Sequence, residues 1–218
     1  KLKNNSKISK FVTNNKKSIA VRFPKHKLLR NLLKNLDYPV AAPSANISSR
    51  LSSVKPSDVK EEFGSKIKYI LNGGKSKIGV ESTILNLLEK PSLLRYGGLD
   101  TKKIENVLKK KLLINTNSKK KLSPGLFPLH YSPGIPLRVN VKKPKKDEAY
   151  LLIKKRKSKL KNYYYLSKVK NIDEAAKNLY STLRKIKNDG FKKIAVETIP
   201  NKGLGKTIND RLKRASKY

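Results

Sequence analysis

The sequence predicts an α/β fold, because short apolar segments of strand length alternate with amphipathic segments of helix length. The clearest case is the last third of the 218-residue chain. Residues 149–153, 163–166 and 193–198 are rich in aliphatic, β-branched and aromatic side chains and have the length of strands. Residues 172–189 and 204–215 have helical spacing. This order of strand, helix, strand and helix is typical of a small parallel α/β domain.

Residues 172–189 give the strongest helix signal. Asp173 and Glu174 stand in the first turn, where the helix dipole favours negative charge. Gly190 follows the last turn, at the position where a left-handed residue commonly ends a helix. The apolar residues that recur on one face of this helix are Ala175, Ala176, Leu179, Leu183 and Ile186.

The first half of the chain also mixes strands and helices, and it shows no simple repeat. Helices are expected at residues 26–36, from Ser57 to residue 63, and at residues 102–110 after a capping Thr101. Strands are expected at residues 18–22, 39–42, 67–71, 80–87 and 92–95.

A polar segment separates the two parts. Residues 115–123 are rich in Lys, Asn and Ser, and residues 123–137 contain four Pro and two Gly, which predict an ordered but irregular loop. We therefore expect a first domain at residues 1–114, a linker at 115–146 and a C-terminal α/β domain at 147–218.

Composition excludes several classes of protein. The chain has no Cys, which rules out disulfides and thiolate metal sites, and His26 and His130 lie too far apart to suggest a structural zinc site. No segment approaches the ~20 apolar residues of a membrane helix, and the N-terminus lacks the apolar region of a signal peptide. We expect a soluble, cytoplasmic chain with no membrane partner. Because it contains no Met, we also expect it to be truncated at the N-terminus.

The net charge of +38 raises a second possibility, a non-enzymatic RNA-binding module. Of the 53 basic residues, 44 are Lys and 9 are Arg, and the Lys are spread along the chain. Solvated Lys explain this pattern better than a dedicated RNA-binding surface does, because nucleic-acid readers usually use Arg for bidentate contacts. Three consecutive tyrosines, residues 163–165, could stack on bases or could be ordinary strand residues.

Four polar segments follow predicted strands, where α/β proteins place their sites. Each also has a plain structural reading: a surface ion pair for Arg22, a Ser-rich turn for residues 42–53, cross-strand pairs for residues 79–84, and an ordinary loop for His130. No GxxxxGK[ST] or GxGxxG motif occurs, and no Ser–His–Asp order is present. The side chains that could bind a polar ligand in these segments are Ser18, Arg22, Ser44, Asn46, Ser52, Ser82, Arg95 and Tyr131.

The order of the segments VRFP, PVAAPSAN, a Gly-Gly turn, GVESTI, LLRYGG and PGLFPLHYSP is more specific than any one of them. Together with the tail INDRL at residues 208–212, it resembles the long form of the YrdC-type threonylcarbamoyl-AMP synthases over nearly the whole chain. The resemblance implies the C-terminal portion of a YrdC-like twisted mixed-sheet α/β domain, a Pro-rich linker and a smaller Rossmann-like α/β domain. The chain departs from the family in lacking a Lys-x-Arg motif before Ser18, and in having Ser49 where the family usually has Gly.

The resemblance implies synthesis of threonylcarbamoyl-AMP from L-threonine, bicarbonate and ATP, with release of pyrophosphate. Mg²⁺ would accompany the ATP phosphates. A partner threonylcarbamoyl transferase would then modify the adenosine beside the anticodon, to N6-threonylcarbamoyladenosine, in tRNAs that read codons beginning with A. With part of the threonine pocket missing, the 218 residues alone are expected to be weak or inactive.

The resemblance also implies roles for individual residues. No protein nucleophile is expected, because adenylyl transfer needs chiefly positioning and neutralisation of phosphate charge. Threonine would be contacted by Arg22, Ala42 and Ser82, and ATP by Ser18, Ser44, Asn46, Ser52, Arg95 and the linker residue Tyr131.

Overall fold

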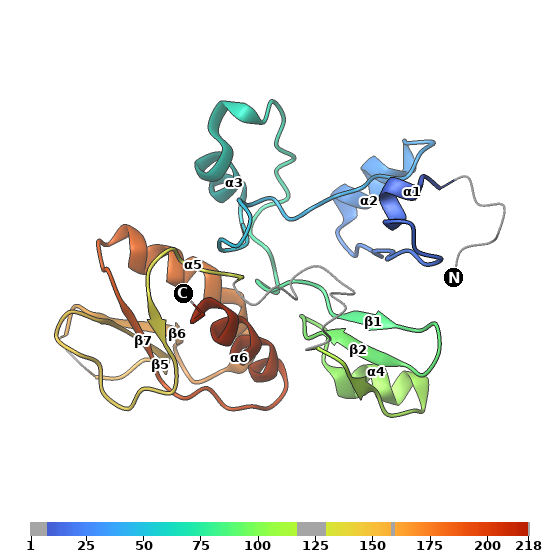
Figure 1. The fold of residues 1–218 in the computed structure, drawn as a ribbon. Coiled ribbons are helices and arrows are strands. Elements are labelled where there is room, and N and C mark those ends of the chain that lie inside the picture. Colours follow the sequence, from blue (N-terminus) through green and yellow to red (C-terminus); the bar gives the residue numbers. More distant parts are fainter. Residues whose placement is uncertain (1–7, 117–129, 158–159, 218) are drawn as a thin grey trace. The chain divides into compact units, whose positions relative to one another are not determined.

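The computed structural model describes residues 8–116, 130–157 and 160–217. The chain forms two compact units, Lys1–Ser44 and Ala45–Tyr218, each of which is considered by itself (Figure 1). The predicted mixed α/β class is confirmed, with helices interleaved among two sheets. No helix in the described ranges is long and apolar enough to cross a membrane.

The described part of the first unit, residues 8–44, contains two helices, α1 (Lys10–Thr13) and α2 (Lys27–Lys34). Helix α2 confirms the centre of the helix predicted at residues 26–36. The strands predicted at residues 18–22 and 39–42 are wrong, and Val21 is 83% exposed. A strand needs a neighbour to accept its backbone hydrogen bonds, and the described part of this unit contains no strand that could be one.

The second unit begins with a loop and helix α3 (Pro56–Phe63), followed by the 3₁₀ turn η1 (Gly64–Lys66). The helix begins one residue before the predicted cap, Ser57. Its first turn is held by the Asp58 carboxylate, which accepts hydrogen bonds from the backbone N–H groups of Val54 and Lys55 at 2.9 and 3.2 Å. The strand predicted at residues 67–71 is wrong, because these residues form no strand.

A small mixed sheet follows, made of β1 (Ile84–Asn86), β2 (Ser92–Arg95) and β3 (Leu113–Ile114). Strand β1 pairs antiparallel with β2, and β2 pairs parallel with β3. Helix α4 (Thr101–Leu108) makes the parallel crossover, and its cap is Asp100, which accepts from Lys102 N at 2.7 Å, so Thr101 is not the capping residue. Of the strand predicted at residues 80–87, only Ile84–Asn86 forms a strand.

The C-terminal sheet is parallel and has the order β4-β7-β5-β6. Its strands are β4 (Leu137–Arg138), β5 (Ala149–Lys154), β6 (Tyr163–Ser167) and β7 (Ile194–Val196). Strand β4 lies within the segment expected to be the linker, residues 115–146, of which residues 117–129 lie outside the described part of the chain. The domain boundaries remain predictions.

Helices α5 (Ile172–Asn188) and α6 (Leu204–Ala215) confirm the two helices predicted in this region. They cover one face of the C-terminal sheet, where the main core forms. Alternation along β5 explains this arrangement, because Leu151 and Ile153 belong to the main core whereas Tyr150 and Leu152 pack on the opposite face.

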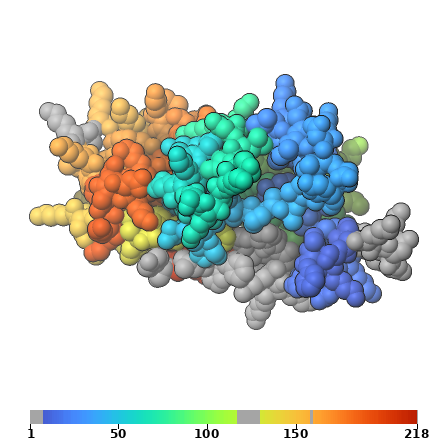
Figure 2. Space-filling view, turned by 90° about the horizontal axis from the view of Figure 1, so that it is seen from above, coloured from blue at the N-terminus to red at the C-terminus, as the bar shows by residue number. Residues whose placement is uncertain are grey.

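Helix α5 also contacts α3 through charged side chains. Arg184 Nη1 donates to Glu62 Oε1 at 3.1 Å, and Arg184 Nε lies 3.8 Å from Asp58 Oδ1. In Figure 2 the teal segment that contains α3 lies against the orange segment that contains α5. The C-terminal helices therefore pack on the C-terminal sheet and on the segment before the first sheet.

The N-terminal cap of α5 gives a prediction about the stability of the chain. Asn171 Oδ1 accepts hydrogen bonds from the N–H groups of Asp173 and Glu174, both at 2.9 Å. We expect Asn171→Ala to lower the free energy of unfolding by about 1 kcal/mol, because two backbone donors lose their acceptor. Asn171→Ser, which keeps a capping oxygen, should recover most of this loss in urea denaturation. Equal stability of the two variants would contradict the assignment.

Candidate functional site

The predicted site residues are divided between the two units. In the first unit, Ser18 is half-buried, whereas Arg22, Ala42 and Ser44 are exposed. The structure brings together five predicted site residues of the second unit, from four segments of the chain. These residues are Asn46, Ser52, Ser82, Arg95 and Tyr131.

The loop around Asn46 is held by its own hydrogen bonds. Asn46 is buried, and its Nδ2 donates to the carbonyl oxygens of Ile47 and Arg50 at 2.8 and 3.2 Å. Ser49 adopts a left-handed conformation with φ of 67°, which costs a residue with a Cβ about 1 kcal/mol. Glycine adopts this conformation without that cost, which explains why the family usually has Gly at this position.

The linker returns to this loop. Ser132 N donates to Ser49 O at 2.8 Å, and Arg50 and Ser132 form an isolated parallel bridge. This pairing places Tyr131, which precedes Ser132, beside the loop that carries Asn46 and Ser52.

Glu81 joins these segments. Its carboxylate accepts hydrogen bonds from Ser52 Oγ at 2.5 Å, from the Tyr180 hydroxyl at 2.9 and 3.0 Å, and from Arg211 Nε at 2.8 Å. The Glu81 side chain is only 14% exposed, and that of Arg211 is 1% exposed. One carboxylate thus connects the Ser-rich loop, the segment that carries Ser82 and both C-terminal helices.

The segments at residues 81–83 and 95–98 lie against each other. Arg95 Nε and Nη2 both donate to Ser82 O, at 3.2 and 2.9 Å. Gly98 N donates to Glu81 O at 2.8 Å. A Cβ added at Gly97 would overlap the backbone of Ser82 and Thr83, so this approach requires glycine. Arg95 therefore orients the residue that is predicted to contact threonine.

Tyr131 is almost fully buried, at 1% exposure. Its ring lies 4.0 Å from the His130 ring and stacks on Tyr180 at 5.9 Å, and the Arg211 guanidinium lies 4.6 Å from its centroid. Its hydroxyl is buried and has no hydrogen-bond partner in the described part of the chain. Burial raises the pKa of Tyr131, so the hydroxyl stays protonated and can donate to a ligand oxygen.

The charges within this cluster reinforce one another. Burial raises the pKa of Glu81, but the charge of Arg211 and the hydrogen bonds from Ser52 and Arg211 outweigh burial and leave the pKa below its ordinary value. Burial and the Glu81 charge raise the pKa of Tyr180, which keeps its hydroxyl protonated as a donor. Burial lowers the pKa of Arg211, but the negative charge of Glu81 opposes this effect, and the pKa lies above its ordinary value. Arg211 therefore stays charged and pairs with Glu81, and it also pairs with its neighbour Asp210.

Sequence reasoning missed Glu81, Tyr180 and Arg211 as parts of the site. Glu81 lies within the GVESTI segment, for which the sequence predicts a ligand contact only at the neighbouring Ser82. A carboxylate next to apolar and hydroxyl residues is a usable signal, because such a charge needs a partner when it is buried. Its partners lie 99 and 130 residues away, where no local pattern connects them.

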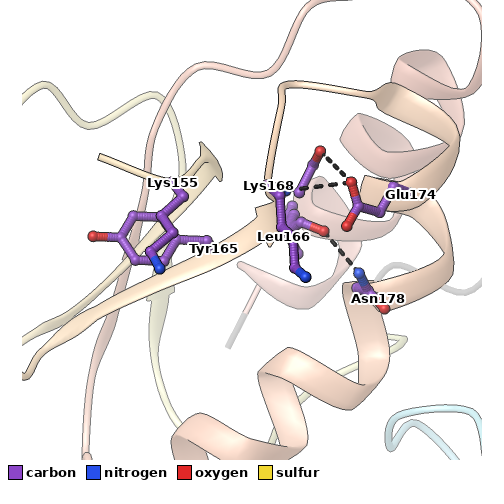
Figure 3. A pocket seen from close by; sticks show the side chains of 7 residues that line it. Lys155, Tyr165, Leu166, Lys168, Glu174 and Asn178 are labelled. Atoms are coloured by element: carbon purple, nitrogen blue, oxygen red, sulfur yellow. Dashed lines mark hydrogen bonds between the residues drawn. The ribbon is translucent and has the colours of Figure 1, made fainter. Parts of the chain in front are cut away.

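A separate cavity of about 270 Å³ lies where β5 and β6 end and α5 begins (Figure 3). Lys155, Tyr165 and Lys168 line it, together with Glu174 and Asn178. Its polar groups bond within the cavity wall, since Glu174 accepts from Ser167 Oγ at 2.6 Å and from Lys168 N at 3.3 Å. None of the predicted site residues lines this cavity.

Two family models match the chain. A family model described as "Telomere recombination" matches residues 1–97, and one described as "Threonylcarbamoyl-AMP synthase, C-terminal domain" matches residues 99–217. The chain belongs to the threonylcarbamoyl-AMP synthase family. Within this family, the chain is 32% identical to threonylcarbamoyl-AMP synthase of Pyrococcus abyssi, covering 97% of the chain and 67% of the relative. The Bacillus subtilis enzyme is 29% identical, covering 96% and 66%.

Two solved structures in this family have the same fold. The crystal structure of P. abyssi Sua5 complexed with L-threonine matches with a TM-score of 0.84 and 31% identity, covering 96% of this chain and 67% of that one. A P. abyssi Sua5 variant, in which a histidine and a tyrosine are replaced by alanine, matches with a TM-score of 0.80 and 30% identity, over 96% and 66%. The chain therefore spans about two thirds of the length of these family members.

Gly97 allows a direct test of the approach between the two segments. We expect Gly97→Ala to lower the free energy of unfolding by about 3 kcal/mol, because its Cβ would meet backbone that cannot move independently. The matched control is Gly98→Ala, for which the three atoms nearest to the new Cβ all belong to the side chain of Ile78, a residue that is 48% exposed. Thermal unfolding of both variants measures the difference, and equal losses would contradict the geometry.

The Glu81 ion pair predicts a pH dependence. Because the folded pKa lies below the ordinary value of 4.5, the stabilisation is fully present above pH 4.5 and is lost as pH falls through the lowered pKa. Glu81→Gln should therefore lose less stability than the unmodified chain on acidification below pH 4.5. Urea denaturation across this range, with the exposed Glu61→Gln as control, measures the effect. Parallel curves for Glu81→Gln and the unmodified chain would contradict it.

Proposed function

We propose that this chain takes part in the synthesis of threonylcarbamoyl-AMP from L-threonine, bicarbonate and ATP, with release of pyrophosphate. Its family membership supports the reaction, since the relatives are named for it. The observation that carries the proposal is the convergence of Ser52, Ser82, Arg95 and Tyr131 around Glu81, because these residues come from the motifs that suggested substrate contacts.

We assign the substrate contacts in two groups. Arg22, Ala42 and Ser82 contact threonine, consistent with the threonine named in the P. abyssi Sua5 complex. ATP is contacted by Ser18, Ser44, Asn46, Ser52, Arg95 and Tyr131. For the four residues of the first unit this assignment rests on sequence motifs alone.

The chemistry that these residues supply is positioning and charge neutralisation. Ser82 offers a hydroxyl to the amino acid, while Arg95 holds the Ser82 carbonyl from the neighbouring segment. Mg²⁺ accompanies the ATP. In nucleotide sites Mg²⁺ is usually held by substrate phosphate oxygens, waters and one or two carboxylates.

The product is a reactive adenylate, which needs an acceptor. We propose that a threonylcarbamoyl transferase passes the threonylcarbamoyl group of this adenylate to adenosine in tRNAs that read codons beginning with A.

The competing hypothesis is an RNA-binding module, in which the tyrosines at residues 163–165 would stack on bases. Tyr164 is buried and its hydroxyl donates to Asp189, and the Tyr165 hydroxyl donates to Arg156 O. These contacts favour the strand reading of the tyrosines, and family membership favours the enzyme.

The reaction is tested by incubating protein with threonine, bicarbonate and ATP, and by detecting the adenylate and pyrophosphate. Residues 1–218 and the longest polypeptide that the coding sequence specifies are assayed side by side, and we expect the 218 residues alone to be the weaker. Absence of adenylate from the longer polypeptide would refute the function, and full activity of the 218 residues would refute their expected weakness. Tight RNA binding with a steep salt dependence and no effect of threonine would support the alternative.

Ser82 gives the sharpest test of the site. We expect Ser82→Ala to weaken threonine binding at least about tenfold, because a hydrogen bond to a charged ligand group is lost. Ser57→Ala, at an exposed position of α3, is the matched control and should leave the affinity unchanged. Isothermal titration with threonine measures both. Unchanged affinity in Ser82→Ala would remove Ser82 from the threonine site.

A further inference from the structure

Helix α6 contacts the two chain segments that carry Ser82 and Arg95. Arg211 Nε donates to Glu81 at 2.8 Å, and Arg211 Nη2 donates to Tyr96 O at 2.6 Å. Four residues earlier on the same helix, Thr207 Oγ1 donates to Gly97 O at 2.9 Å. Residues four apart lie on one face of a helix, so this single face holds the two segments together.

These contacts close a ring through the site. Glu81 precedes Ser82, Arg95 precedes Tyr96, and Arg95 itself bonds to Ser82 O. Arg211 completes the ring by holding Glu81 on one side and Tyr96 on the other. A closed ring of hydrogen bonds restricts each member more than an open chain does, so the position of Ser82 depends on Arg211.

Tyr180 adds a second contact from the C-terminal region to the same carboxylate. It lies on α5, is 1% exposed, and its hydroxyl donates to Glu81. The third donor to Glu81 is Ser52, which is itself a predicted ATP contact. Two of the three side chains that fix this carboxylate therefore come from the C-terminal helices, and the third belongs to the substrate loop.

Removing one donor does not leave the others undisturbed. A buried carboxylate that loses a hydrogen bond regains solvation by moving toward water or by attracting another donor. Either response displaces Glu81, and Ser82 moves with it because the two are adjacent. Ser52 is displaced as well, because its hydroxyl bonds to the same carboxylate.

We propose that Arg211 and Tyr180 are positioning residues of the substrate site, which set the places of Ser82 and Ser52 through Glu81. The C-terminal helices thereby complete a site whose substrate contacts come from elsewhere in the chain. This inference rests on the proposed function, since it takes Ser82 and Ser52 as substrate contacts.

The test uses Tyr180→Phe, which removes one hydroxyl and keeps the ring that stacks on Tyr131. Its matched control is Tyr164→Phe, which removes a hydroxyl on β6 that donates to Asp189, the residue that follows α5. Arg211→Met is the stronger change, and Arg211→Lys, which keeps the charge, should recover part of its effect. If Arg211→Met fails to fold, Tyr180→Phe still decides the question.

Two readouts separate positioning from substrate binding. The first is amide hydrogen exchange, without ligand, at Gly98 and Leu99, which donate to Glu81 O and Thr83 Oγ1. We expect Tyr180→Phe to speed this exchange about tenfold and Tyr164→Phe to leave it unchanged. The second is kinetics on the longest polypeptide, where Tyr180→Phe should raise KM for threonine about tenfold with a smaller change in kcat.

Each outcome decides the proposal. Faster exchange and a raised KM in Tyr180→Phe alone support positioning. Equal effects of the two tyrosine variants, or no effect of Tyr180→Phe on exchange, overturn it. If the unmodified protein forms no adenylate, the proposed function fails, and exchange still tests the contact between Glu81 and the C-terminal helices. If exchange rises and KM stays constant, the contact holds but its role in substrate positioning is refuted.

Discussion

The charge of Glu81 governs how the described parts of the second unit fit together. A carboxylate removed from water costs several kcal/mol unless donors replace its hydration. Here the donors are Ser52, Tyr180 and Arg211, which come from a loop and from two helices. Each of the three lowers the cost of burial, so the carboxylate ties the packing of the C-terminal helices to the geometry of the loop.

The second constraint is the absence of a side chain at Gly97. It lets residues 95–98 lie directly on the backbone of residues 81–83, where the Arg95 guanidinium reaches Ser82 O with two hydrogen bonds. The planar fork of Arg suits such a paired contact, which Lys would make with a single mobile donor. Backbone proximity and a planar cation together explain why Arg95, although predicted to contact ATP, also fixes the position of Ser82.

Sequence patterns predicted the C-terminal domain well, because its helices and strands are encoded locally. Helix α6 has the predicted bounds, and α5 ends one residue early. The strands expected at residues 18–22, 39–42 and 67–71 did not form, because a strand depends on a partner that periodicity does not reveal. The same limit applied to the site: motif order indicated Ser52, Ser82 and Arg95, but the side chains that join them lie far away in sequence.

Arg and Lys differ in how they are used in this structure, and the cost of burying charge explains the difference. In the described part of the chain, the arginines that pair with carboxylates include Arg50, Arg138, Arg156, Arg184, Arg211 and Arg214. A guanidinium is more weakly hydrated than an ammonium and is therefore less costly to bury, which suits it to pairs such as the one with Glu81. The excess positive charge is consequently carried by Lys, whose strongly hydrated ammonium groups favour water. A net charge of +38 thus coexists with an interior in which the buried ion pairs are nearly all made by arginine.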